Sequence, residues 1–413
     1  MQPKSVWPFM LVISLLIFGC DAEHTILESF LEQSKGTMLV SFDFHEYFGY
    51  SADIDGDFAI VGSGGAAYIY QKTAKGWEKS ANLIKRYDSD GQMLSNERSY
   101  YVGYPVALKN DIAVVGVPTK DNIPQQQQND LGVVHVYRRN GSDWEKVTDL
   151  QPATAQSANL FGAALSFDGH RLAVGDPYSE CVYVFSYDGN QWTESSCIVP
   201  TQGGTDDDFG ASVCVNGDVL VVGAENSDLK AREAGAAFIF RVNGSTWQEE
   251  AFLVPAVATM YAHFGAAVAV HNNLVVIGAQ DYTDGKGRNG AATIYYFDKA
   301  QWVREQTLIL VSTADTYFGQ AVAVFNNTLL IGAPDYFDGG GVFVYTRAGG
   351  SWKWQNTLKA IGSDFPSNFG WSVALDENSL LVGAPVKYAP HGYADSDCFY
   401  DPYFGAAYIY SAF

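Results

Sequence analysis

The sequence predicts an all-β protein, a seven-bladed β-propeller of four-stranded antiparallel blades, its ring closed by an N-terminal strand. The first observation is a recurring Phe-Gly pair, followed 14 residues after each start by a second glycine. The copies begin at Phe48, Phe161, Phe209, Phe264, Phe318 and Phe369, with a degenerate one at Val102. Alternating apolar residues between the marks flank turns such as Asp55-Gly56, which favour tight hairpins. Each copy therefore predicts two antiparallel strands, a and b.

The second observation is a block with equally fixed spacing. Gly65 leads to Trp77 after 12 residues, and five later blocks repeat this spacing, with Glu180 in place of the glycine in the third. Turns such as Asn140-Gly141 lie in the middle of the block and predict a second hairpin, strands c and d. Four antiparallel strands repeated seven times are typical of a propeller, because ring closure buries the two apolar faces that a linear array would expose.

The two ends of the repeat array are complementary. The last block, from Gly405, matches Gly65–Tyr70 for six residues and has no strand d after it. Met38–Ser41 precede the first Phe-Gly pair and have no strand c before them. We therefore expect the N-terminal segment to supply the last strand of the ring.

Phe-Gly followed by Gly-Ala-Pro, as at Gly332–Pro334 and Gly383–Pro385, resembles the FG-GAP repeat of integrin α-subunit propellers and of many secreted bacterial proteins. The resemblance covers roughly residues 38–413 and implies adhesion, recognition or scaffolding. Integrin-type repeats often carry a calcium loop between strands a and b, and Asp53–Asp57 looks like a fragment of one. This hairpin is as short as its siblings and cannot wrap a calcium ion, which takes six to eight oxygen ligands. We predict no required cofactor and no metal site, with weak calcium binding by the Asp-rich loops left open.

The N-terminus predicts export. Phe9–Gly19 form an apolar run, broken only by Ser14, that suits a signal peptide better than a membrane span. We divide the chain into a signal peptide (1–19), a short linker (20–36) and the propeller (37–413). Cys20 ends a stretch that resembles a lipoprotein signal, so lipidation on Cys20, ordinary cleavage and a retained anchor stay open. The sequons at Asn140, Asn243 and Asn326 matter only in a eukaryotic host.

The formal charge of -21 disfavours nucleic acid and anionic lipid as partners. The seven histidines are scattered without metal-ligand spacing, and no nucleophile elbow or phosphate loop is present. We therefore expect a protein that is not an enzyme.

Two cysteines lie on opposite arms of the third c–d hairpin. Cys181 and Cys197 can form a disulfide in an exported protein if a three-residue turn, Asp188–Asn190, puts both on one face. Cys214 is expected to be a small buried residue of an inner strand.

Loop length indicates where a ligand binds. The b–c connections vary from 3 to 22 residues, whereas the a–b and c–d turns are constant. Since b–c and d–a connections emerge on one face of a propeller, we expect binding there and little contact area on the opposite face. These loops are rich in Asp and Tyr, whose side chains suit recognition of a protein or glycan. The candidate ligand-binding residues are Asp281, Tyr282, Asp284, Asp335, Tyr336, Asp338, Tyr393, Asp395, Asp397 and Tyr400.

The leading hypothesis is an exported, non-enzymatic propeller that binds a protein or glycan at the cell surface or envelope. One alternative is a lyase or hydrolase acting on polysaccharide from a site in the central channel. Another is a purely structural envelope module. The sequence leaves the ligand, the host and the oligomeric state open.

Overall fold

The structure, a computed structural model, describes residues 36–40, 47–84, 105–118, 132–153, 160–195, 197–285, 287–312, 314–337, 339–360, 368–387 and 404–411. They belong to one compact unit, Gly36–Phe413. The predicted signal peptide and Cys20 lie outside the described residues. No helix in the described ranges is long and apolar enough to cross a membrane.

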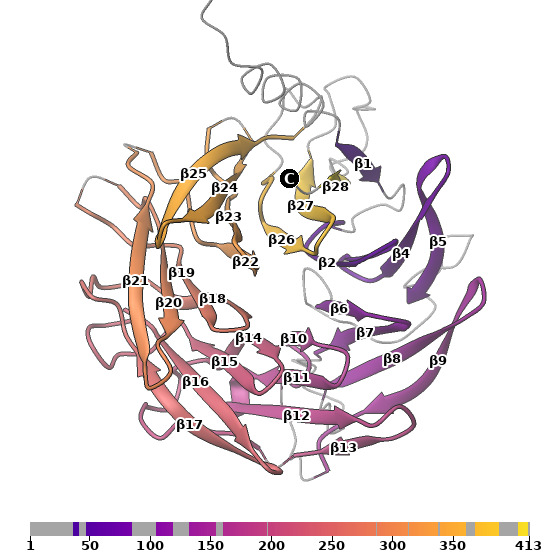
Figure 1. The fold of residues 1–413 in the computed structure, drawn as a ribbon, viewed down its shortest axis with the longest axis horizontal. Helices are drawn as coiled ribbons and strands as arrows, with labels where there is room; N and C mark the ends of the chain where they lie inside the picture. The colour runs from indigo at the N-terminus through magenta and orange to yellow at the C-terminus, as the bar shows by residue number, and fades with distance from the viewer. Residues whose placement is uncertain are drawn as a thin grey trace, which may run out of the picture. The chain divides into compact units, whose positions relative to one another are not determined.

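Seven four-stranded antiparallel sheets surround a central axis (Figure 1), which confirms the predicted fold class. We number the blades 1 to 7 along the chain and letter their strands a to d from the axis outward. Blades 1 to 3 are β2 (Ser51–Asp55), β3 (Phe58–Gly62), β4 (Ala67–Thr73), β5 (Gly76–Ile84); β6 (Val106–Lys109), β7 (Ile112–Val117), β8 (Val133–Asn140), β9 (Asp143–Leu150); and β10 (Ala164–Phe167), β11 (Arg171–Asp176), β12 (Cys181–Tyr187), β13 (Trp192–Glu194).

Blades 4 to 6 are β14 (Phe209–Asn216), β15 (Val219–Ala224), β16 (Ala236–Asn243), β17 (Thr246–Leu253); β18 (Phe264–His271), β19 (Leu274–Ala279), β20 (Ala291–Phe297), β21 (Trp302–Ile309); and β22 (Ala321–Phe325), β23 (Thr328–Ala333), β24 (Gly341–Ala348), β25 (Ser351–Leu358). Blade 7 is β26 (Ser372–Leu375), β27 (Ser379–Lys387), β28 (Phe404–Ser411) and β1 (Thr37–Val40). A 3-10 helix, η1 (Pro177–Ser179), lies between strands b and c of blade 3.

The N-terminal strand closes the ring, as the complementary ends predict. β1 pairs antiparallel with β28, with Leu39 opposite Ala407. The Leu39 side chain is 3% exposed and joins the core between blades 7 and 1. The first strand of the chain therefore completes the last blade.

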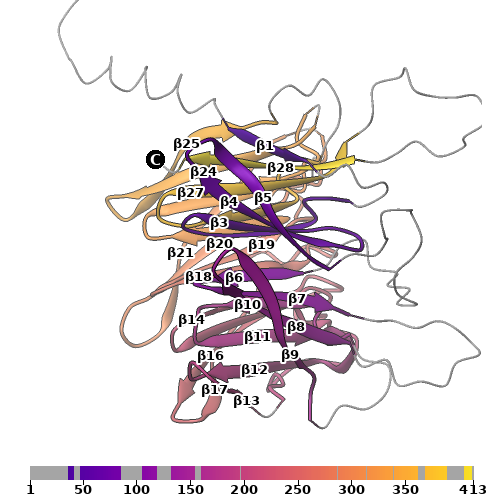
Figure 2. The same ribbon diagram turned by 90° about the vertical axis from the view of Figure 1, so that its right-hand side faces the viewer.

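The two faces of the ring differ. The a–b and c–d turns share one face, which we call the turn face; it lies on the left in Figure 2. The b–c and d–a connections share the opposite face, which we call the loop face. The a–b turns are tight: the pairing of Asn216 with Val219 leaves only Gly217 and Asp218 between the strands.

The repeated phenylalanines lie between neighbouring blades. Phe264 belongs to a buried cluster that also contains Val219 and Val221 of blade 4 and Ile277 of its own blade 5. The six Phe-Gly phenylalanines are each at most 1% exposed. Burying such a ring contributes about 1.5–3 kcal/mol, so the repeated phenylalanine is a main source of cohesion between blades.

The repeated glycines allow the backbones of neighbouring blades to approach closely. A Cβ on Gly278 would overlap the carbonyl oxygen of Gly319 in the next blade, and one on Gly235 would overlap the carbonyl of Phe264. In blade 3, Glu180 occupies the position that Gly235 has in blade 4. Its carboxylate accepts hydrogen bonds from the backbone N–H of Phe209 at 2.7 Å and of Asp208 at 3.0 Å, so a side chain makes this contact between blades.

Candidate functional site

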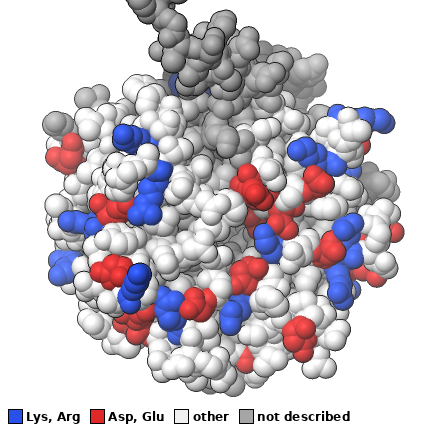
Figure 3. All heavy atoms as spheres, viewed as in Figure 1, with Lys and Arg blue, Asp and Glu red and all other residues white. Residues whose placement is uncertain are grey.

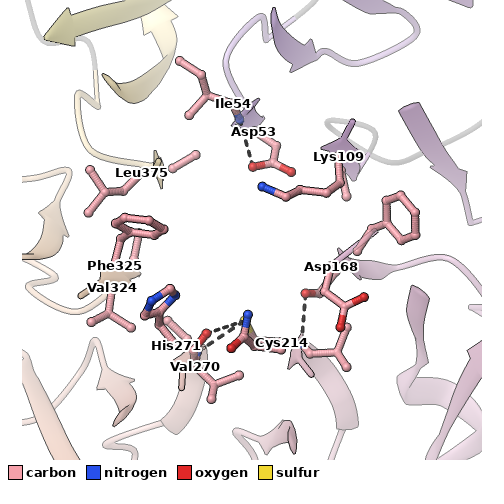
Figure 4. A pocket seen from close by; sticks show the side chains of 18 of the residues that line it. Asp53, Ile54, Lys109, Asp168, Cys214, Val270, His271, Val324, Phe325 and Leu375 are labelled. Atoms are coloured by element: carbon pink, nitrogen blue, oxygen red, sulfur yellow. Dashed lines mark hydrogen bonds between the residues drawn. The ribbon is translucent and has the colours of Figure 1, made fainter. Parts of the chain in front are cut away.

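The seven a strands enclose a central channel. At the turn-face end of this channel the structure contains a cavity of about 400 Å³, lined by residues of every a strand. Figure 4 shows its side chains arranged around an open centre, and Figure 3 shows acidic and basic side chains interspersed around the middle of the turn face. We call it the turn-face cavity. The turn face therefore offers more contact area than its tight turns alone, contrary to the expectation from the sequence.

Polar side chains of this cavity connect one blade to the next. Asp53 Oδ2 accepts the backbone N–H of Leu108 at 2.7 Å, and Ser166 Oγ accepts that of Val215 at 3.0 Å. In aligned repeats Asp53 and Ser166 occupy the same place, five residues after the Phe-Gly start. In blades 2 and 4, a backbone N–H group on the channel-facing edge of strand a is thus bound by a side chain of the preceding blade.

Cys214 occupies the same place in blade 4, and its Sγ accepts the backbone N–H of Val270 at 3.3 Å. It is half-buried and lines the cavity, so the expectation of a buried apolar residue was wrong. Burial raises the pKa of its thiol.

Asp55 and its equivalents in the turns form a second set of contacts between blades. Asp55 Oδ1 binds Lys109 Nζ at 2.6 Å, and its Oδ2 accepts the backbone N–H of Asn110 at 2.7 Å. Asp168 accepts the N–H of Gly217 in the same way, and Asp376 that of Gly56. The aspartates of these a–b turns therefore accept hydrogen bonds from the backbone of the neighbouring blade.

Asp53 has a strongly perturbed acidity. Burial raises its pKa to about 7, against the lowering effect of the N–H groups of Leu108 and Ile54 and of the Lys109 charge. The carboxyl group is half-buried at the channel wall (Figure 4) and takes up a proton near neutral pH.

Aromatic and acidic side chains meet at the opposite end of the channel. Tyr50 precedes β2 and Glu225 follows β15, so both lie at the loop-face end of their strands. Burial and the charge of Glu225 raise the pKa of Tyr50. Because blades 1 and 4 are on opposite sides of the ring, the two side chains interact across the channel. Trp371 of blade 7 packs against Tyr50 with 5.6 Å between ring centroids. We call Tyr50, Trp371 and Glu225 the loop-face mouth.

A histidine lies between acidic groups beside this mouth. His263 Nδ1 is 2.7 Å from Asp281 Oδ2, and its Nε2 is 3.7 Å from Glu233 Oε2. The hydrogen bond with Asp281 and the charges of Asp281 and Glu225 raise the pKa of His263 despite its burial. Burial in turn raises the pKa of Glu225, which accepts no hydrogen bond from the described residues.

Of the predicted ligand-binding residues of blade 5, one is available to a ligand. Asp281 is 9% exposed and bound to His263, with Arg288 Nη1 at 3.4 Å. Tyr282 is half-buried against the core between blades 4 and 5. Asp284 is exposed and accepts a hydrogen bond from Asn289 Nδ2 at 3.1 Å.

The blade 6 residues follow the same division. Asp335 is exposed and accepts Asn368 Nδ2 at 3.2 Å. Tyr336 is half-buried, with its ring 5.0 Å from that of Phe343. Asp338, Tyr393, Asp395, Asp397 and Tyr400 lie outside the described residues.

The cysteines of blade 3 are bonded: Cys181 and Cys197 form a disulfide. The expected three-residue turn is wrong, because Tyr187 pairs with Trp192 across a four-residue turn. A later shift in register pairs Val182 with Ile198. This shift puts Cys181 and Cys197 on the same face of the sheet, which explains how they meet.

Within the described ranges, no three His, Cys, Asp or Glu side chains converge as a metal ion would require. The carboxylates of the turn-face cavity are surrounded mainly by backbone N–H groups, which are donors and cannot share a cation with them. The donor set therefore suits hydrogen bonding between blades.

The fold and these sites define a closed β-propeller of repeated four-stranded units, with a channel that has distinct ends. Residues 192–240 and 247–295 match the family model of the FG-GAP repeat. Each match begins in strand d of one blade and ends in strand c of the next, so the family repeat straddles the blade boundary. The chain therefore has two matches to the FG-GAP repeat within a seven-bladed propeller, which is consistent with an integrin-α-like propeller.

Solved structures share the fold at low identity. "Structure of U3-55K" is 10% identical, with 91% of this chain and 99% of that chain covered and a TM-score of 0.55. "Crystal Structure of Mitotic Checkpoint Complex" is 13% identical, with 98% and 99% covered and a TM-score of 0.51. At such identities the likeness concerns the fold alone. No curated protein matches the sequence.

Proposed function

We propose that this chain is an exported, non-enzymatic recognition propeller that binds its ligand on the loop face, centred on the loop-face mouth. The observation that carries the proposal is the ring contact of Tyr50 with Trp371 at the loop-face end of the channel, together with the half-buried carboxylate of Glu225, whose charge acts on Tyr50. Aromatic faces and a carboxylate without a hydrogen-bond donor attract a cation. The favoured ligand is therefore a protein that presents a Lys or Arg side chain.

The surrounding loops contribute the rest of the surface. Asp284 and Asp335 are exposed on b–c connections of the loop face and add acceptors there. A glycan is the alternative ligand, since the same acceptors suit sugar hydroxyls. The Cys181–Cys197 disulfide supports an oxidising compartment and hence export; lipidation of Cys20 stays a prediction.

A second candidate function rests on one observation. His263 is held by Asp281 at 2.7 Å with Glu225 close by, an arrangement that can move protons in a lyase or hydrolase acting on polysaccharide. Turnover assays on a polysaccharide panel test it. Product formation that His263→Gln abolishes would establish the enzyme and refute the non-enzymatic proposal.

The test of recognition is a pair of arrays. The full-length protein is applied to peptides with a single central Lys, Arg or Gln and to a glycan array. We expect retention on Lys or Arg peptides and none on the matched Gln peptides. Retention on glycans alone would replace the protein ligand by a glycan, and retention on neither array would refute loop-face recognition.

A further inference from the structure

The turn-face cavity lies at the other end of the channel from the loop-face mouth, and the function proposed above does not use it. Its volume of about 400 Å³ is within the range of small-molecule sites, roughly 300–1,000 Å³. Its walls come from the a strands of all seven blades, which are joined by hydrogen bonds between neighbouring blades. The cavity is therefore preformed.

One side of the wall is polar. Asp53, Lys109, Asp168 and Asn216, from blades 1 to 4, line it. Figure 4 shows Asp53, Lys109 and Asp168 grouped together on this side. A ligand would meet hydrogen-bonding groups here.

The other side is apolar and aromatic except for Asp376, whose Oδ2 accepts the backbone N–H of Gly56. Val270, Val324, Phe325 and Leu375, from blades 5 to 7, line it (Figure 4). The ring of His271 packs on that of Phe325 with 4.5 Å between centroids. Burial lowers the pKa of His271, so this aromatic surface is uncharged at neutral pH.

The charges of the polar side already have partners. Lys109 Nζ binds Asp55 Oδ1 at 2.6 Å. Asp168 accepts three backbone N–H groups, those of His170, Arg171 and Gly217. An anionic ligand would therefore find no unpaired cation, and the oxygens of Asp168 are already hydrogen-bonded to neutral donors. The carboxylate oxygens keep a second lone pair, and the Lys109 ammonium keeps further donors, so both can still bind hydroxyl groups.

Backbone donors add to this set. The N–H groups of Leu108, Val215 and Val270 are accepted by side chains of the preceding blade. In blades 5 and 6 the residue at this position is an alanine, Ala269 and Ala323. The backbone N–H groups of Val324 and Leu375 in the blades that follow therefore lack a side-chain acceptor of this kind, and both residues line the cavity.

We propose that the turn-face cavity binds a neutral polyhydroxylated molecule of about monosaccharide size. One face of its ring, which carries C–H groups, packs on Phe325 and His271. Its hydroxyl groups bind Asp53, Lys109 and Asn216. The proposal goes beyond loop-face recognition and concerns a separate site.

Saturation-transfer difference NMR on the full-length protein tests the proposal. The probes are D-glucose, D-galactose, D-mannose and N-acetyl-D-glucosamine, with acetate as an anionic control of small size. We expect saturable binding of at least one sugar, with a Kd in the low millimolar range, about -4 kcal/mol, and no saturation by acetate.

Variants locate the site. Phe325→Ala is expected to weaken the sugar at least about tenfold, and Lys109→Met to weaken it as well. Phe337→Ala is the matched control, since Phe337 is 57% exposed on a b–c loop. Glu225→Gln is also expected to leave sugar binding unchanged, which separates this site from the loop-face mouth. Circular dichroism and melting curves verify that each variant is folded.

Two results would overturn the proposal. One is that no sugar saturates up to ~20 mM, well above the Kd expected. The other is that a folded Phe325→Ala protein binds the sugar as tightly as the wild type.

Discussion

Asp53 Oδ2 in blade 1 accepts the backbone N–H of Leu108 in blade 2 at 2.7 Å, while its Oδ1 accepts the N–H of Ile54 at 2.9 Å. One carboxyl group thus serves the edge strands of two blades at the channel wall. Burial raises its pKa to about 7 from an ordinary value of 3.8.

This raised pKa predicts a pH dependence of stability. The folded state holds the Asp53 proton more tightly than the unfolded state, so Asp53 favours folding below pH 4 and this contribution is lost as the pH rises to about 7. Asp53→Asn removes the titration. We expect the free energy of unfolding of the variant, minus that of the wild type, to rise by at least ~1 kcal/mol from pH 4 to pH 8. Urea unfolding at both pH values measures it, and a constant difference would contradict the assignment.

The N-terminal strand predicts a position-specific effect on stability. Leu39 is buried between blades 7 and 1, whereas Met38, its neighbour on β1, is 43% exposed. Leu39→Ala should lower the free energy of unfolding by about 2–5 kcal/mol, because it leaves a cavity at the closure of the ring. Met38→Ala is the control and should change it by less than ~0.5 kcal/mol. Equal effects of the two changes would argue against the ring closure described here.

Calcium removal should leave stability unchanged. Asp55 is occupied by Lys109 and by the backbone N–H of Asn110, so the residues that resemble a calcium-loop fragment bind the next blade instead. Differential scanning calorimetry with and without EDTA is expected to give melting temperatures within ~2 °C of each other. A fall of more than about 10 °C would require several kcal/mol of linked binding and would refute this account.

An incomplete contact at the outer strands predicts a stabilising substitution. Trp302 Nε1 donates to Glu250 of the preceding blade at 2.9 Å, and Glu250 is the residue that bulges out of the c–d pairing. In blade 1 the bulged residue is Ser80, and the buried Nε1 of Trp144 in blade 2 has no partner among the residues that the structure describes. Ser80→Glu should supply one and raise the free energy of unfolding by ~1 kcal/mol. Ser80→Ala is the control; a gain in both, or in neither, would mean that the hydrogen bond is not responsible.

The fold was predictable because its contacts repeat at fixed spacing. The phenylalanine represented by Phe264 recurs in six repeats, with Val102 in its place in the other, and the glycine represented by Gly278 follows at the same separation in all seven. The structure shows the physical reason: the phenylalanine fills the space between blades, and the glycine lets two backbones approach. Ring closure was predictable because the strand absent after Tyr410 is present at Met38. The repeat spacing and the complementary ends can both be recognised in short segments of the sequence.

The channel sites were not predictable in the same way. Tyr50 and Glu225 meet only because the ring brings opposite blades together, and no spacing in the sequence encodes that encounter. The role of Asp53 had a visible signal, since Asp53, Ser166 and Cys214 replace alanine at one place in the aligned repeats. Tyr282 and Tyr336 were predicted to bind a ligand because their loops are rich in Asp and Tyr. Loop composition does not show that both residues are half-buried against the core.

The central claim is that the loop-face mouth recognises a cation, and the affinity of one charge-neutralised variant tests it most directly. Isothermal titration with the tightest Lys or Arg peptide from the array gives the Kd of the wild type, of Glu225→Gln and of Glu377→Gln. Both substitutions remove one negative charge, but Glu377 is exposed in a turn of the opposite face. The account predicts that Glu225→Gln weakens binding at least about tenfold, or ~1.4 kcal/mol, and that Glu377→Gln changes it less than twofold, roughly 0.4 kcal/mol. Equal affinities of the two variants would contradict it.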